Sequence, residues 1–170
     1  MAPNRFDRTL LAANRWVLIA ILAAMAIMVF ANVTLRFLTD RSILWVEEAS
    51  RYLMIWLTFL GMGPVLRYGG HLGIDTLQEL LPRHAAAIRA SIFALLLGFF
   101  AFMAWVGLRY AVLAWSQTTP ILRIPIGAVY LAMPIGFALA LAHLLLMAIP
   151  YVRRRAVLAD GEFDADAAKI

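Results

Sequence analysis

Four long apolar runs, each bounded by arginines, constrain the fold of this 170-residue chain more than any other feature. The first run has 20 residues, from Trp16 to Leu35, and the third has 19, from Ala90 to Leu108. A helix needs about 20 predominantly apolar residues to cross the hydrocarbon core of a bilayer. Runs of this length therefore predict helices that span a membrane.

The composition supports this prediction. The chain is 64% hydrophobic and 15% charged, whereas a soluble domain is about 45–50% apolar and about 25% charged. A chain this short exposes much of its surface, which excludes a water-soluble monomer. The net charge of +5 comes from arginines scattered between apolar runs, so we expect no nucleic-acid partner. The absence of cysteine excludes disulfides, thiol catalysis and iron–sulfur clusters.

The second apolar run is too short to cross the membrane by itself. Only 15 residues separate Arg51 from Arg67, which is about 22 Å of helix against a core of about 30 Å. The span must therefore begin earlier, near Ile43. This earlier start brings Glu47, Glu48 and Arg51 into the membrane or its interface.

The predicted fold class is an all-α integral membrane protein with four transmembrane helices. A short amphipathic helix in the cytoplasmic interface is predicted between the second and third spans, because apolar residues recur there at helical spacing. Pro134 is expected to kink the fourth span, since proline lacks a backbone donor. The predicted spans are about 16–36, 43–66, 88–110 and 126–150, with the interfacial helix at about 71–81.

The same pattern divides the chain into three parts. Residues 1–15 form a predicted cytoplasmic segment, 16–152 a single four-helix membrane domain, and 153–170 a cytoplasmic tail predicted to be disordered. Nine arginines flank the spans on the side of both termini and four flank the other side. The positive-inside rule therefore places both termini in the cytoplasm.

Glu47, Glu48 and Arg51 are the ionisable residues of the second span. Either carboxylate is within helical reach of the guanidinium, at i,i+4 or i,i+3. Three interpretations stay open at this point: a helix start among lipid headgroups, an interface with a partner membrane protein, or an ion relay.

The middles of the spans offer little polar chemistry. Thr58 and His143 are the main polar residues there, and a solute path needs polar groups near the membrane midplane. We expect His143 to form an interhelical hydrogen bond, since no second histidine lies in a span to complete a haem site. No catalytic, nucleotide-binding or metal-binding motif is present, so the sequence predicts a supporting subunit and no enzyme.

Two blocks of the sequence resemble a known family. Residues 43–77, ILWVEEASRYLMIWLTFLGMGPVLRYGGHLGIDTL, resemble the small permease (DctQ-like) subunit of tripartite ATP-independent periplasmic (TRAP) transporters. Residues 122–139, LRIPIGAVYLAMPIGFAL, resemble the last span of that family. The features that match in the first block are Trp45, Glu47, Glu48, Arg51, Tyr52, Trp56, Gly61, Arg67, His71 and Asp75.

The resemblance implies a role in uptake of organic acids such as C4-dicarboxylates, sugar acids or sialic acids. The expected partners are a large permease subunit, a periplasmic solute-binding protein and membrane lipid, in the bacterial inner membrane. It implies no cofactor or metal of its own, with sodium coupling through the large subunit. The implied subunit-interface candidates are Glu47, Glu48, Arg51, Trp56 and Gly61, and Arg67, His71 and Asp75 would organise the cytoplasmic turn and interfacial helix.

One alternative function stays open. A self-sufficient small transporter could assemble from identical copies, because symmetry would bring several Glu47 and Glu48 side chains together. Its stoichiometry would distinguish it from a subunit that needs a different partner.

Overall fold

The computed structural model describes residues 5–67 and 85–153, and regular structure in these two ranges is helical. Four of the helices are long and apolar enough to cross a membrane, which confirms the predicted all-α fold with four spans. The predicted interfacial helix, with His71 and Asp75, lies outside the described residues, as does the tail from residue 154. The helices are α1 (Arg5–Thr39), α2 (Leu44–Arg67), α4 (Ala85–Leu113), α5 (Ile126–Tyr130) and α6 (Ala132–Arg153).

The first helix is longer than its predicted span of 16–36. It has 35 residues, about 52 Å at 1.5 Å per residue, so it extends beyond the bilayer core. Neither glycine nor proline occurs between Arg5 and Thr39 to interrupt it. The apolar spans within the four long helices are Thr9–Thr39, Leu44–Leu66, Ala90–Leu113 and Ile126–Leu146.

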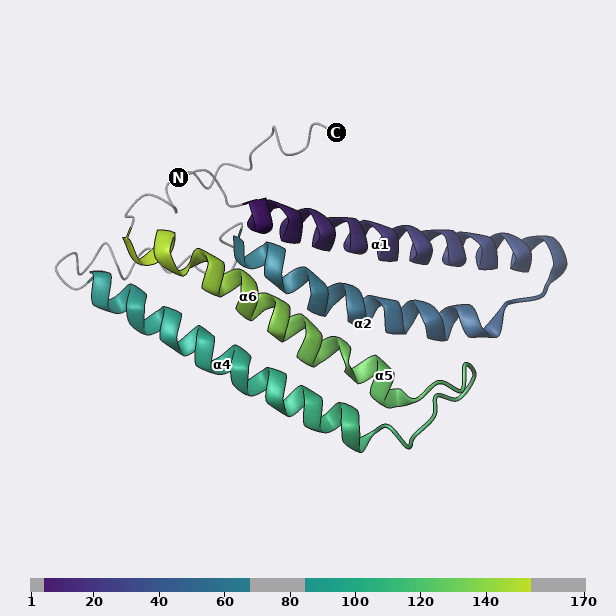
Figure 1. The fold of residues 1–170 in the computed structure, drawn as a ribbon. Helices are drawn as coiled ribbons and strands as arrows, with labels where there is room; N and C mark the ends of the chain where they lie inside the picture. The colour runs from purple at the N-terminus through teal and green to yellow at the C-terminus, as the bar shows by residue number, and fades with distance from the viewer. Residues whose placement is uncertain (1–4, 68–84, 154–170) are drawn as a thin grey trace.

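The helices form a single layer. Their main contacts are α1 with α2, α2 with α6, and α6 with α4, so they lie side by side in that order (Figure 1). The start of α1 and the end of α6 lie at the same end of this layer, as an even number of spans requires (Figure 1). The opposite end carries the α1–α2 connection and the α4–α5 loop, residues 114–125.

The buried core lies where α2 and α4 pack against α6. The ring of Phe137 on α6 is only 7% exposed and lies at its centre. Its centroid is 5.8 Å from the Phe59 ring of α2 and 5.7 Å from the Phe100 ring of α4. Such tilted and edge-to-face aromatic pairs stabilise a core beyond the area that they bury.

Gly136 sets the distance between α2 and α6. A Cβ atom on Gly136 would lie 2.6 Å from both the Cβ and the carbonyl oxygen of Phe59. The two backbones therefore touch at this point, and only glycine fits. Gly63 on α2 has a similar role, because its Cβ would overlap the ring of His143.

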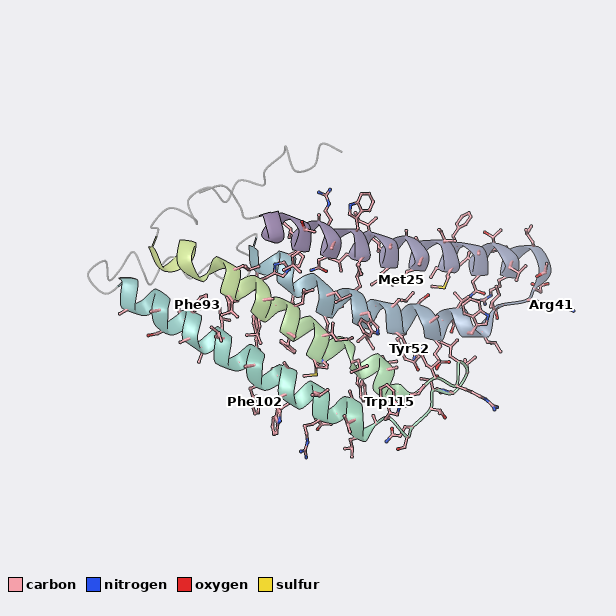
Figure 2. The ribbon with its side chains drawn as sticks, in the orientation of Figure 1. Met25, Arg41, Tyr52, Phe93, Phe102 and Trp115 are labelled. Atoms are coloured by element: carbon pink, nitrogen blue, oxygen red, sulfur yellow. The ribbon has the colours of Figure 1, made fainter. Side chains whose placement is uncertain are left out.

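α1 packs on α2 through one narrow stripe. The buried or half-buried residues on this stripe recur at alternating spacings of three and four, the pattern of a left-handed helix pair. Met25 lies near the middle of the stripe, between the two helices (Figure 2). The stripe consists of Leu11, Asn14, Leu18, Ile21, Met25, Met28 and Asn32.

The fourth span is divided into α5 and α6 at Leu131. We attribute the interruption to Pro134, which cannot donate a hydrogen bond to the carbonyl of Tyr130 and crowds it sterically. The ladder resumes directly, since the amide of Ile135 donates to the Leu131 carbonyl at 3.1 Å. The proline therefore interrupts the helix about one turn before its own position, and the helix resumes as α6.

Gly136→Ala should destabilise the protein, because the new methyl group would push α6 away from α2. We expect a loss of about 1–3 kcal/mol in the free energy of unfolding, measured by titration with sodium dodecyl sulfate in mixed micelles. Gly98→Ala on α4 is the matched control, since no atom lies within 4 Å of its Cβ position. Equal stability of the two variants would contradict the close packing at Gly136.

Candidate functional site

Glu48 is the central polar residue at the end of the layer that carries the α4–α5 loop, here called the loop end. It lies in the first turns of α2 and is only 5% exposed. Its Oε2 accepts hydrogen bonds from the amides of Ile121 and Leu122, at 2.9 and 3.1 Å. Its Oε1 accepts a hydrogen bond from the Tyr52 hydroxyl, one turn along α2, at 2.8 Å. One side chain thus ties α2 to the α4–α5 loop, more than 70 residues away in the sequence.

The α4–α5 loop folds as a short hairpin. The amide of Ile126 donates to the Gln117 carbonyl at 2.8 Å, and the amide of Thr119 donates to the Ile124 carbonyl at 2.9 Å. The Thr119 hydroxyl, which is buried, accepts the amide of Ile124 at 3.2 Å. Arg123, near the tip, has a φ of 54°, the left-handed conformation that turns the chain back. The Glu48 carboxylate accepts hydrogen bonds from the amides of Ile121 and Leu122, which directly precede this turn.

The structure gives Glu48 partners that the sequence did not indicate. Helical spacing suggested that it would pair with Arg51, but both of its oxygens are hydrogen-bonded to Tyr52 and the loop. Glu47 and Arg51 are exposed on α2, beside a Glu48 that points inward. The three residues named together as subunit-interface candidates therefore have different settings: Glu48 is an internal clamp, and Glu47 and Arg51 are exposed charges.

The remaining candidates occupy different places on α2. Trp56 is half-buried, and Gly61 has no atom within 4 Å of its Cβ position, so that face of the helix is open. Arg67 is the last residue of the helix, while His71 and Asp75 lie beyond the described range. The structure thus brings Glu47, Glu48 and Arg51 to one end of α2 and leaves Gly61 about three turns away.

Two asparagines tether α1 to α2, and neither was predicted from the sequence. The side-chain amide of Asn14, buried at 6% exposure, donates to the Leu60 carbonyl at 3.1 Å. At the other end of the helix, the Asn32 side-chain oxygen accepts the amide of Ile43 at 2.6 Å. Each asparagine interrupts an apolar stripe with heptad spacing, which is the signal that could have identified them.

His143 is fully buried on the side of α6 that faces Gly63 of α2. Its ring therefore lies between two helices, which is the setting of a structural residue. Among residues 5–67 and 85–153, no group of three or more histidine, aspartate or glutamate side chains could hold a metal ion.

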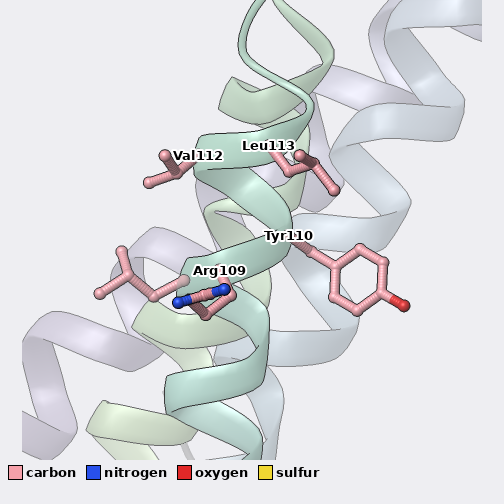
Figure 3. Close-up of a pocket in the computed structure, with 5 residues that line it drawn as sticks. Arg109, Tyr110, Val112 and Leu113 are labelled. Atoms are coloured by element: carbon pink, nitrogen blue, oxygen red, sulfur yellow. The ribbon is translucent and has the colours of Figure 1, made fainter.

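A shallow depression lies on the outer surface of α4. The described residues that line it all belong to this one helix, and their side chains point in different directions (Figure 3). No other helix in the described part of the chain contributes to the lining, which is unlike the concave, enclosed pockets that bind small solutes. The lining residues are Leu108, Arg109, Tyr110, Val112 and Leu113.

Comparison with known families decides what kind of protein carries this site. Residues 25–154 match the family described as tripartite ATP-independent periplasmic transporters, DctQ component. The chain belongs to the DctQ family of TRAP transporter small permeases. It is therefore a transporter permease subunit and not an enzyme, as the sequence predicted.

Three relatives show the extent of the similarity. The ectoine TRAP transporter small permease protein TeaB of Halomonas elongata is 31% identical over 138 residues, which cover 78% of this chain and 70% of TeaB. The C4-dicarboxylate TRAP transporter small permease protein DctQ of Rhodobacter capsulatus is 30% identical over 116 residues, covering 66% of this chain and 51% of that protein. The isethionate TRAP transporter permease protein DctMQ of Oleidesulfovibrio alaskensis is 26% identical over 104 residues, covering 59% of this chain but 16% of the longer protein.

Glu48→Ala should release the α4–α5 loop, because the Ile121 and Leu122 amides would lose a charged acceptor. A hydrogen bond to a charged group contributes about 1.5–3 kcal/mol, so we expect amide hydrogen exchange in residues 119–124 to rise at least about tenfold. Hydrogen-exchange mass spectrometry of the purified protein would measure this.

Glu47→Ala is the matched control, since Glu47 is the adjacent carboxylate and is exposed. It should leave exchange in the loop unchanged. Equal exchange in the Glu48→Ala variant and the wild type would show that the clamp does not hold the loop.

Proposed function

We propose that this DctQ-family subunit is a scaffold that carries no solute itself and holds the large permease subunit of a TRAP transporter. The observation that carries the proposal is the single layer of helices, whose two faces are not covered by any other described helix (Figure 1). The DctMQ relative supports a permease partner, because there the matching region is part of one longer permease chain.

The layer provides no enclosed route for a hydrophilic solute. Where α2, α4 and α6 meet, the space is filled by phenylalanine, leucine and alanine side chains of the buried core. A transport path requires polar groups near the membrane midplane, and usually discontinuous helices that surround them. We therefore assign the path to the large subunit, and with it the sodium coupling expected for these systems.

The outward face of α1 is the surface that we assign to the large subunit. Among the described residues of the α1 span, Asn14 alone is buried, and α2 is the main neighbour of this helix. Alanines are interspersed among the bulky residues of its exposed surface, including Ala12, Ala20, Ala23 and Ala26. Small residues allow the close backbone approach that holds helices together in membranes.

We assign the loop end of the layer to the periplasm and both termini to the cytoplasm. The four spans would then lie in the inner membrane. Four arginines near this end against nine near the other support the assignment. Exposed Glu47 and Arg51, together with the clamped α4–α5 loop, would then face the periplasmic side. There they would anchor the large subunit and present a fixed surface to the solute-binding protein.

The solute is proposed only as a class, an organic acid such as a C4-dicarboxylate, a sugar acid or a sialic acid. The names of the relatives give ectoine, C4-dicarboxylate and isethionate as their solutes. Three different solutes among related TRAP permease proteins support the view that the solute is selected outside the region that they share with this chain.

Ala23→Leu should weaken association with the large subunit, because Ala23 lies on α1 opposite the stripe that contacts α2. Overpacking costs about 1–3 kcal/mol, so we expect about a tenfold loss of co-purified large subunit in mild detergent. Ala101→Leu is the matched control on α4, an exposed alanine in another span.

Equal recovery of the large subunit with both alanine variants would contradict the assignment of α1. A stable assembly of this chain alone, with no permease partner, would contradict the scaffold role and favour the homo-oligomeric alternative.

A further inference from the structure

The outer surface of α4 is apolar and bulky. Its most exposed residues are large, with Leu95, Phe102 and Trp105 all more than half exposed. Phe102 points away from the layer (Figure 2). Bulky, irregular surfaces pack poorly against another helix, whereas lipid chains adapt to them. This face is therefore suited to contact with lipid.

One charge interrupts this apolar face. Arg109 is exposed, and its guanidinium carbon lies 5.8 Å from the centre of the Trp105 ring, one turn closer to the start of α4. The ring holds the guanidinium by a cation–π contact, so the charge points along the helix toward the membrane interior. In the described part of the chain, Arg109 meets this ring and forms no ion pair with a carboxylate. A cation in such a place needs an external anion.

The depth of Arg109 identifies the anion. Arg89 and Arg109 are 20 residues apart on α4, which is about 30 Å of helix and equals the thickness of the hydrocarbon core. Arg109 therefore lies near the outer end of the α4 span, which runs to Leu113, and its long side chain is within reach of lipid phosphates. Beside it, the depression on α4 offers the aliphatic side chains of Leu108, Val112 and Leu113, with Tyr110 at its edge (Figure 3).

We propose that this surface is a phospholipid site, in which Arg109 binds the phosphate of a glycerophospholipid. Trp105 would orient the guanidinium, whose planar donors match phosphate oxygens. Leu108 and, deeper in the membrane, Trp105 and Phe102 would contact the upper part of an acyl chain, since these exposed residues lie on the inner side of Arg109. The site is independent of the proposed partner surface on α1, because the two lie on helices at opposite edges of the layer (Figure 1).

The test measures phosphatidylglycerol retained by the purified full-length protein, co-expressed with its large subunit, by native mass spectrometry in detergent. Arg109→Gln should lower the apparent affinity about tenfold, since it removes a charge-assisted hydrogen bond. Trp105→Leu should lower it about twofold to fivefold through loss of the cation–π contact. Arg123→Gln, an arginine on the α4–α5 loop, is the matched control and should retain the lipid as wild type does.

A second lipid separates the phosphate from the acyl chains. A glycosyl diacylglycerol with the same chains lacks phosphate, so Arg109→Gln should leave its retention unchanged. Equal loss of both lipids, or no loss of phosphatidylglycerol, would overturn the proposal. Loss of the large subunit with unchanged retention of phosphatidylglycerol would also overturn it, because the anion would then be a side chain of the partner.

Discussion

The hydrocarbon core supplies no hydrogen-bond partner, so every polar group within this chain's spans must find one in protein or at the membrane surface. Three polar side chains meet this requirement, and each also joins two parts of the structure. Asn14 joins α1 to α2, and Asn32 joins α1 to Ile43, the residue directly before α2. Glu48 joins α2 to the α4–α5 loop. Apolar packing between helices is weakly specific in lipid. The three polar residues secure α1 and the α4–α5 loop against the α2 segment, and Gly136 sets the approach of α6 to α2.

The resulting layer supports the proposal that this subunit carries no transport path of its own. Four helices in a row bury one continuous core along α6 and expose α1 and α4 at the two edges. Both edges expose bulky apolar residues, and the edge on α4 also carries Arg109 beside Trp105. We propose that α1 faces the permease and α4 the bilayer, as a scaffold between the two would require.

Much of this fold could be predicted from the sequence, because span length and arginine position are local properties. The early start of the second helix near residue 43 followed from the short interval between Arg51 and Arg67, and α2 begins at Leu44. The order of helices in the layer could not be predicted, since it depends on Gly136 meeting Phe59 across two spans. Glu48 could be named as a candidate from the sequence, because a carboxylate is costly to leave unpaired in a membrane. Its partners could not be predicted, because backbone amides 73 and 74 residues away leave no pattern in the sequence.

The central claim is that this subunit supports transport without conducting the solute. Proteoliposomes under an inward sodium gradient, with a labelled organic acid and the solute-binding protein outside, test it most directly. We predict no uptake with this chain alone and uptake once the large subunit is added. Uptake by vesicles that contain this chain as their sole membrane protein would contradict the claim.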